Sequence, residues 1–179
     1  MPKPVTTDNY LHAIATVLGA SPERAAAYPL TAYPTPDAAL STLVADANFA
    51  CPALQVNAWT SQQAPTFAYE FNDDTAPQIF TPPGRVAPVA THGSELQYLF
   101  DLPNAPFPTP LSGAQDALAT SMRAAWVSFA TSGNPASDAV PWPAIGGAGS
   151  APVLSLVPAR PRIESDSDSR HHCAFWAGE

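Results

Sequence analysis

Charged side chains are scarce in this sequence, and positive ones are the scarcest. Charged residues make up 12% of the 179 residues, about half of the ~25% that is usual in soluble proteins. Seven Lys and Arg stand against fifteen Asp and Glu, for a net charge of −8. Seven positive side chains cannot form a stripe that follows a phosphate backbone, so nucleic acid is not an expected partner. An anionic membrane surface would repel the chain for the same reason, so no membrane partner is expected either.

Long apolar runs are also absent. No run approaches the ~20 residues of a membrane-spanning helix, and the opening residues, MPKPVTTDNY, have no apolar segment after their lysine. A secretory signal peptide needs such a segment, so we expect none in this chain. These features leave the localisation of the protein unknown.

Cysteine is limited to Cys51 and Cys173. Their spacing fits no zinc pattern and no CxxC pair occurs, so no metal site is expected from them. Two interpretations remain open at this level, namely two buried free thiols or one long-range disulfide.

Proline is the residue in excess. The 22 prolines far exceed the usual ~5%, which indicates many loops and short elements. Hydrophobic residues make up 46%, an ordinary share for a globular core. The length is that of one domain or of a piece of a larger one. Because the charge is so low, we expect much of the chain to be covered by protein.

Apolar residues at helical spacing predict several helices in the first 60 residues. Asp8 and Asp37 are plausible N-caps, and Pro22 and Pro52 are placed to open helices. The side chains expected to face a core on the last of these helices are Leu54, Val56 and Trp59.

The period changes to two in PTFAYEF, residues 65–71, which predicts a strand. Residues 153–157 predict a second strand, 93–100 a short helix, and 170–176 a final helical turn. A strong amphipathic helix ends at Gly133. The aromatic side chains read as core anchors rather than a ligand stack are Trp126, Phe129, Trp142 and Trp176. Many helices with so few strands indicate one end of an α/β structure, and we expect strand 65–71 to pair with a sheet outside this chain.

One histidine stands in a setting that suggests chemistry. In VATHGSELQYLF, His92 precedes Gly93 and follows the predicted strand and a loop. Hydrolysis of an ester by an α/β enzyme needs a serine on a tight elbow, an acid, and a histidine on a loop after a late strand. His92 fits the histidine's place, and the glycine lets the backbone turn sharply. By itself such a pair is more often an ordinary turn or a packed surface histidine.

Five stretches in order give this histidine its context. They are YPLTAYPTPDAALSTLVADANFACP, PTFAYEF, ATHGSELQYLF, MRAAWVSFATSGNPASDAVPWP and HHCAFW. Together they resemble the C-terminal third of the type B carboxylesterases, the family that includes the cholinesterases. The resemblance implies an α/β-hydrolase fold, of which residues 1–179 would be the C-terminal segment, with helices and a few sheet-edge strands. It also implies a serine esterase that hydrolyses carboxylic esters without a cofactor.

The resemblance assigns roles to four residues. His92 matches the family's catalytic histidine, and Glu95 matches the supporting acid of its "HG.E" pattern. Cys51 and Cys173 match a disulfide pair of the family, which would place the parent protein in an oxidising, secreted setting.

The rest of the catalytic machinery is missing from the 179 residues. No serine lies in a G-x-S-x-G elbow, and no glycine-rich oxyanion loop is present. The family's triad acid belongs upstream of these residues. We therefore expect the chain alone to be inactive, and its partner to be the N-terminal part of the same esterase or a second copy of itself, with a small ester as substrate.

Three alternatives stay open. In the first, the chain is a non-catalytic binding or interaction module derived from the esterase fold. In the second, Ser94 serves as an unexpected nucleophile. In the third, an acid of this chain, such as Asp73, Asp74 or Glu95, orients His92 in place of the missing triad acid.

His12 is expected to be a packing or surface residue rather than a catalytic one. A metal site from His171, His172 and Cys173 is conceivable, but it is disfavoured because adjacent side chains point apart and the disulfide interpretation is better supported.

Overall fold

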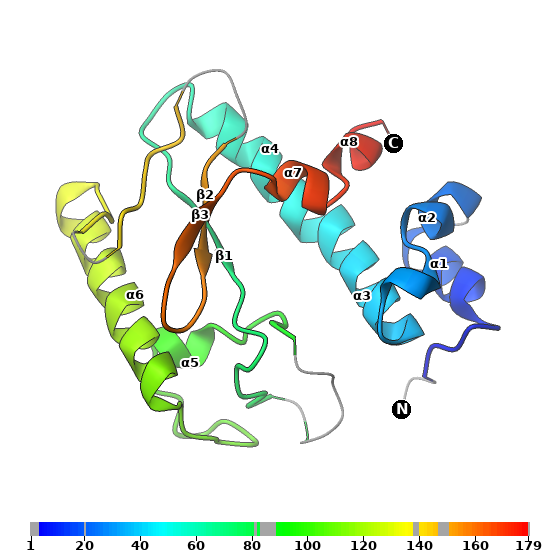
Figure 1. Cartoon of the computed structure of the whole chain (residues 1–179), viewed down its shortest axis with the longest axis horizontal. Helices are drawn as coiled ribbons and strands as arrows, with labels where there is room; N and C mark the ends of the chain where they lie inside the picture. Colours follow the sequence, from blue (N-terminus) through cyan, green and yellow to red (C-terminus); the bar gives the residue numbers. More distant parts are fainter. Residues whose placement is uncertain are drawn as a thin grey trace. The chain divides into compact units, whose positions relative to one another are not determined.

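The structure, a computed structural model, describes residues 4–19, 21–80, 82, 89–137, 140–146 and 151–178. The predicted hydrolase segment contains two compact units (Figure 1). The first is made from both ends of the chain, residues 1–56 and 166–179, and the second from residues 57–165.

The first unit is helical. Its elements are α1 (Tyr10–Leu18), α2 (Pro22–Ala27), η1 (Leu30–Ala32), α3 (Pro36–Ala45), the π-helical turn η2 (Asp46–Ala50), the start of α4 (Cys51–Thr60), α7 (Ser167–Arg170) and α8 (Cys173–Trp176). The buried residues of its core are Tyr10, Ile14, Tyr28, Ala39 and Leu43. The predicted helices are therefore present, with the final turn divided into two short helices.

The predicted helix starts need three corrections. Asn9, not Asp8, precedes α1, and Thr35, not Asp37, caps α3 by accepting a hydrogen bond from the Ala38 amide. Asp37 lies inside the first turn and accepts from the Val5 amide instead. Pro52 does not open a separate helix, because α3, η2 and α4 follow one another without a break.

The second unit contains a small mixed sheet. Strands β1 (Ala68–Phe71), β2 (Val153–Leu156) and β3 (Arg162–Glu164) lie in the order β1-β2-β3. β1 and β2 are parallel, with Ala68 opposite Val153, and β2 and β3 are antiparallel. β2 is buried along its whole length, as its continuous apolar run requires. The prediction that strand 65–71 pairs only outside the chain is wrong, since β1 pairs with β2.

β1 nevertheless stands at the edge of this sheet. The Asn72 amide donates to the Leu156 carbonyl of β2. Since backbone groups alternate in direction along a strand, those of Glu70 and Ala68 face β2 as well. The backbone groups of Tyr69 and Phe71 face the opposite edge. Within the described ranges, no strand pairs with that edge of β1.

Helix α6 (Gly113–Ser132) packs on the sheet, beside the short helix α5 (Leu96–Leu99) (Figure 1). Ser112 and Gln115 form a capping box at its start, and Gly133 ends it in the left-handed conformation. The buried core between α6 and the sheet includes Leu118, Ala119, Met122, Leu154 and Leu156.

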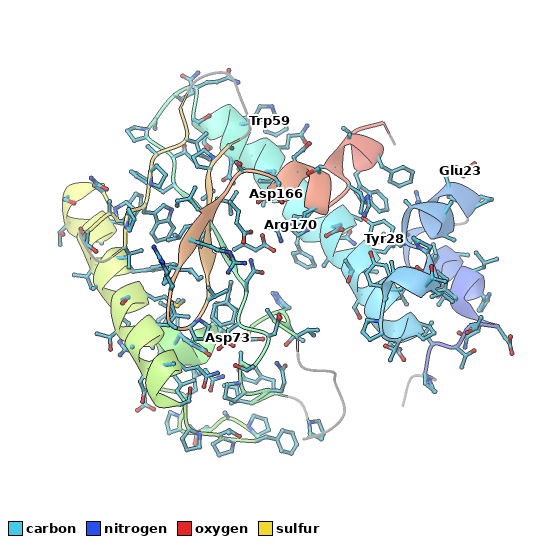
Figure 2. The ribbon with its side chains drawn as sticks, in the orientation of Figure 1. Glu23, Tyr28, Trp59, Asp73, Asp166 and Arg170 are labelled. Atoms are coloured by element: carbon cyan, nitrogen blue, oxygen red, sulfur yellow. A yellow bond between two sulfur atoms is a disulfide. The ribbon has the colours of Figure 1, made fainter. Side chains whose placement is uncertain are left out.

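The aromatic anchors divide between core and surface. Trp142 is buried, and its indole N–H donates to the Ala68 carbonyl at 2.9 Å. Trp126 and Trp176 are half-buried. Phe129 is 50% exposed, so its assignment to the core is wrong. The same correction applies to α4, where Trp59 is 60% exposed and Val56 is also exposed (Figure 2).

Two classes of site are absent from the described residues, a membrane-spanning helix and a cluster of metal ligands. Among the helices of the described residues, none is long and apolar enough to cross a membrane. Over the same part of the chain, no three His, Cys, Asp or Glu side chains are grouped so that they could hold a metal ion.

Candidate active site

The predicted catalytic histidine lies in a tight turn that leads into α5. The Ser94 amide donates to the Thr91 carbonyl at 3.0 Å, and the Leu96 amide donates to the Gly93 carbonyl at 3.2 Å. Gly93 has φ +85°, a left-handed conformation that side chains strain. The glycine next to His92 is thus required by the turn, and the His92 side chain is exposed.

Ser94 is locked inside this turn. It is 4% exposed. Its hydroxyl donates to the Thr91 carbonyl at 2.6 Å and accepts from the Thr91 amide at 2.9 Å. A hydroxyl held in this way serves the turn's own geometry, which argues against the alternative that Ser94 is the nucleophile.

Glu95 completes the same turn and is half-buried at the start of α5. Burial raises the pKa of Tyr69, and the nearby Glu95 carboxylate raises that pKa further. The acid of the "HG.E" pattern therefore lies near the Tyr69 hydroxyl on β1. Its supporting role toward His92 stays a prediction.

Asp73 accepts several hydrogen bonds in the second unit and is only 2% exposed (Figure 2). One carboxylate oxygen accepts from the Thr75 amide at 2.9 Å and from the Thr75 hydroxyl at 2.6 Å. The other accepts from the Tyr98 hydroxyl and from the Gln115 amide nitrogen, the latter at 2.8 Å. Burial alone would raise the pKa of Asp73, but the hydrogen bonds from Thr75, Tyr98 and Gln115 outweigh it and lower that pKa. Burial and Asp73 also raise the pKa of Tyr98.

These contacts decide what the neighbouring acids do. Both oxygens of Asp73 are engaged with Thr75, Tyr98 and Gln115, so Asp73 is a structural centre and a poor candidate to orient His92 directly. Asp74 is exposed, as expected of a charged residue after a strand. The sequence offered no signal for the role of Asp73, because its partners lie 25 and 42 residues away.

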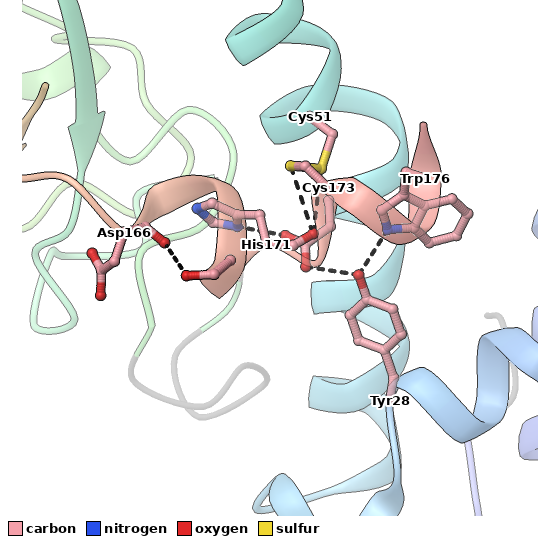
Figure 3. Close-up of a disulfide and its surroundings, with 8 residues drawn as sticks. Tyr28, Cys51, Asp166, His171, Cys173 and Trp176 are labelled. Carbon is pink, nitrogen blue, oxygen red and sulfur yellow. Dashed lines mark hydrogen bonds and ion pairs between the residues drawn. A yellow bond between two sulfur atoms is a disulfide. The ribbon is translucent and has the colours of Figure 1, made fainter. Parts of the chain in front are cut away.

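In the first unit, Cys51 and Cys173 form the disulfide that the family resemblance implied (Figure 3). Close by, His171 Nδ1 lies 2.7 Å from Asp46 Oδ1, and the Tyr28 hydroxyl donates to Asp46 Oδ2 at 2.9 Å. The Trp176 indole N–H donates to that same hydroxyl at 2.8 Å. His171 and Cys173 are thus engaged in protein contacts.

His172 belongs to the same cluster and is not placed as a metal ligand. It has φ +53° and sets its ring edge-to-face against Tyr28, with centroids 4.9 Å apart. His12 is exposed on α1. The position of His12 agrees with its prediction as a packing or surface residue.

A pocket of about 420 Å³ opens in the second unit. Its walls are Thr60, Ala64, Pro65, Thr66, Phe67, Tyr69, Ala125, Trp126, Phe129, Pro135 and Trp142. No residue of the histidine turn is among these walls.

The fold identifies the structural class of the chain. The chain has the fold of the α/β-hydrolase esterases. It superposes on a thermophilic PNB esterase with a TM-score of 0.64, at 24% identity and over 97% of this chain. A second match, to a PNB esterase, has a TM-score of 0.61 at 24% identity over 96% of this chain.

The particular family follows from the sequence. Residues 26–176 match the carboxylesterase family, and the chain belongs to that family. A mouse relative, pyrethroid hydrolase Ces2a of Mus musculus, is 31% identical over 104 residues, which are 58% of this chain and 18% of that protein. The chain spans 34% of the thermophilic PNB esterase and 33% of the PNB esterase.

Proposed function

We propose that this chain is the C-terminal third of a serine carboxylesterase and that His92 is its general acid and base. The observation that carries the proposal is the position of His92: an exposed side chain on a hydrogen-bonded turn after the edge strand, within the matched residues 26–176. The substrate class is a carboxylic ester.

The chemistry that His92 would supply is a proton relay. Its imidazole takes the proton from a serine hydroxyl as the oxygen attacks the ester carbonyl, and then gives that proton to the departing alcohol. Water repeats the sequence to release the carboxylic acid and regenerate the serine. Since no G-x-S-x-G elbow occurs in the 179 residues, the serine, the oxyanion donors and the triad acid would come from another polypeptide segment.

The partner would be the N-terminal part of the same esterase. The outward edge of β1, where the backbone groups of Tyr69 and Phe71 point, offers an unused row of hydrogen-bonding groups in the described residues. Such an edge pairs readily with another strand. Trp59, 60% exposed on α4, adds apolar surface that a partner would cover. The disulfide fits an oxidising compartment, which we propose for the parent protein.

A complementation experiment tests the catalytic role. The chain is co-expressed with the part of the thermophilic PNB esterase that it does not match, and the co-purified pair is assayed with a short-chain aryl ester. We expect turnover that His92→Ala lowers by about 10⁴- to 10⁶-fold. The matched control is His12→Ala, an exposed histidine on α1, which should leave turnover unchanged. Full turnover with His92→Ala would disprove the proposed role.

Two measurements on the chain alone test the missing parts. We expect no saturable ester hydrolysis and no labelling by a serine-directed phosphonate. We also expect association through the β1 edge, seen as dimers or larger species by light scattering. A labelled, active chain would contradict the assignment of the nucleophile to another segment. A monomer that co-purifies with no partner would instead favour the binding-module alternative.

A further inference from the structure

We infer that Asp73 is a positioning residue for His92: it fixes the histidine turn from two sides without contacting the reacting atoms. The inference rests on the proposed function of His92 for its catalytic consequence. Its structural part, that Asp73 holds the turn, stands on the hydrogen bonds of the second unit alone.

The first connection runs through α5. The Tyr98 hydroxyl donates to Asp73 Oδ2, and Tyr98 is fully buried. Tyr98 lies six residues after His92, in the helix that begins where the histidine turn ends. The Tyr98 amide also donates to the Glu95 carbonyl at 2.9 Å. Anchoring this tyrosine therefore fixes where α5 starts, and with it the position of the His92 backbone.

The second connection runs through the segment after β1. Asp73 Oδ1 folds this segment back by accepting from the Thr75 amide and hydroxyl. A few residues on, the Gln78 side chain accepts from the Thr91 hydroxyl at 2.5 Å, directly before His92. The Pro77 carbonyl accepts from the Gln97 side chain at 2.8 Å, directly after the turn. Both ends of the histidine turn are thus tied to the segment that Asp73 shapes.

Gln115 makes the arrangement rigid. Its side-chain nitrogen donates to Asp73 Oδ2, and its side-chain oxygen accepts from the Ser112 amide at 2.8 Å. One amide group therefore links the carboxylate to the first turn of the long helix α6. An acid with four donors aimed at it prefers the charged form, so a neutral group of the same shape cannot replace it fully.

The test uses Asp73→Asn, which keeps the shape and removes the charge. The asparagine nitrogen would face donors that now face an oxygen. Amide hydrogen exchange on the 179-residue chain is read at Ser94, in the histidine turn, relative to Ala125 in the middle of α6. We expect the Ser94 exchange rate to rise at least tenfold relative to Ala125. In the complemented pair, kcat should fall by about 10- to 100-fold with KM within a factor of two, because a small misplacement of a catalytic group is costly.

Asp46→Asn is the matched control. Asp46 is a buried acid of the first unit, 1% exposed, and it too accepts from a tyrosine hydroxyl. It should leave the Ser94 exchange ratio and kcat unchanged. Equal effects from both variants would show general loosening and overturn the inference, as would an unchanged Ser94 ratio in Asp73→Asn.

Tyr98→Phe covers the case in which Asp73→Asn does not fold. It removes one donor to Asp73 and should raise the Ser94 ratio by a smaller factor, about threefold, from loss of a single hydrogen bond. No rise in this variant would overturn the inference. The exchange readout does not depend on catalysis, so a failure of the proposed function, seen with His92→Ala, is distinguished from a failure of the Asp73 inference.

Discussion

The two units of this protein both bury an aspartate beneath a tyrosine hydroxyl, but they use it differently. In the first unit, the Asp46 carboxylate accepts a hydrogen bond from the Tyr28 hydroxyl and contacts the His171 ring nitrogen. These contacts join the C-terminal residues to the helices. In the second unit, the Asp73 carboxylate accepts hydrogen bonds from Tyr98, Gln115 and Thr75. These bonds connect the end of β1, the following turn, α5 and the start of α6.

The difference lies in what else holds each aspartate's surroundings. The first unit has a covalent bond, Cys51–Cys173, and the Trp176–Tyr28 contact beside its acid. The second unit has only hydrogen bonds and packing around Asp73. A cluster held by a disulfide should lose less of its structure when one hydrogen bond is removed than a cluster held by hydrogen bonds and packing. We therefore expect the second unit, which carries His92, to respond more sharply to small polar changes in its geometry.

The largest effect should come from removing the disulfide. Replacing Cys51 and Cys173 with alanine opens a loop of 122 residues, and the chain-entropy argument gives a loss of about 5 kcal/mol. The loss should appear in the first unit, measured by exchange at α3 amides, and the Ser94 amide should stay protected. Equal loss of protection in both units would show that they unfold as one, which breaks the comparison.

A somewhat smaller effect is expected at His171. His171→Ala removes the ring nitrogen that lies 2.7 Å from the buried Asp46 carboxylate and leaves the hydrogen bond from the Tyr28 hydroxyl in place. Removing a hydrogen-bond partner from a buried carboxylate costs up to about 3 kcal/mol. Chemical denaturation followed by tryptophan fluorescence measures the loss. A change under 1 kcal/mol would mean that water replaces the histidine at no cost.

The two tyrosines give a direct comparison. Tyr28→Phe removes a donor to Asp46 and the acceptor of the Trp176 indole, whereas Tyr98→Phe removes a donor to Asp73. A hydrogen bond to a charged group is worth about 2 kcal/mol, so Tyr28→Phe should cost more in unfolding free energy. In contrast, only Tyr98→Phe should disturb the histidine turn. The reverse order in stability, from urea unfolding, would show that the disulfide fully compensates in the first unit.

The smallest effect is on acid stability. Because the pKa of Asp73 is lowered in the folded chain, the carboxylate stabilises the fold above the ordinary pKa of an aspartate. This stabilisation is lost as the pH falls below that ordinary value toward the lowered one. We expect Asp73 to contribute less stability at the acid end, and we expect a flatter pH dependence of stability in Asp73→Asn. If Asp73→Asn loses stability at low pH as steeply as the unchanged chain does, other carboxylates are responsible for that loss.

The sequence predicted local structure well where one residue type settles it. Pro22 opens α2, Gly133 ends α6, and the alternation in residues 65–71 marks β1. The caps were harder, because Asp8 and Asp37 each stand beside a second residue that can cap, Asn9 and Thr35.

The pattern failed where long-range contacts decide. β3 was not predicted, since Arg162–Glu164 is short and pairs only because β2 lies beside it. Val56 and Trp59 form an apolar pattern, but a pattern does not tell what covers it, and both are exposed. The partners of Asp73 were equally invisible, because only the folded backbone brings Tyr98 and Gln115 to it. The disulfide came from family resemblance rather than from spacing.

The disulfide also sets an order of events during synthesis. Cys173 follows Cys51 by 122 residues, so at about 5–20 residues per second the first thiol emerges from the ribosome roughly 6–24 s before its partner. During that interval residues 57–165 emerge and can begin to fold, whereas the helical unit still lacks residues 166–179. Within these 179 residues no third cysteine competes for either partner, so the pairing seen in the folded chain is the one that these residues can form among themselves.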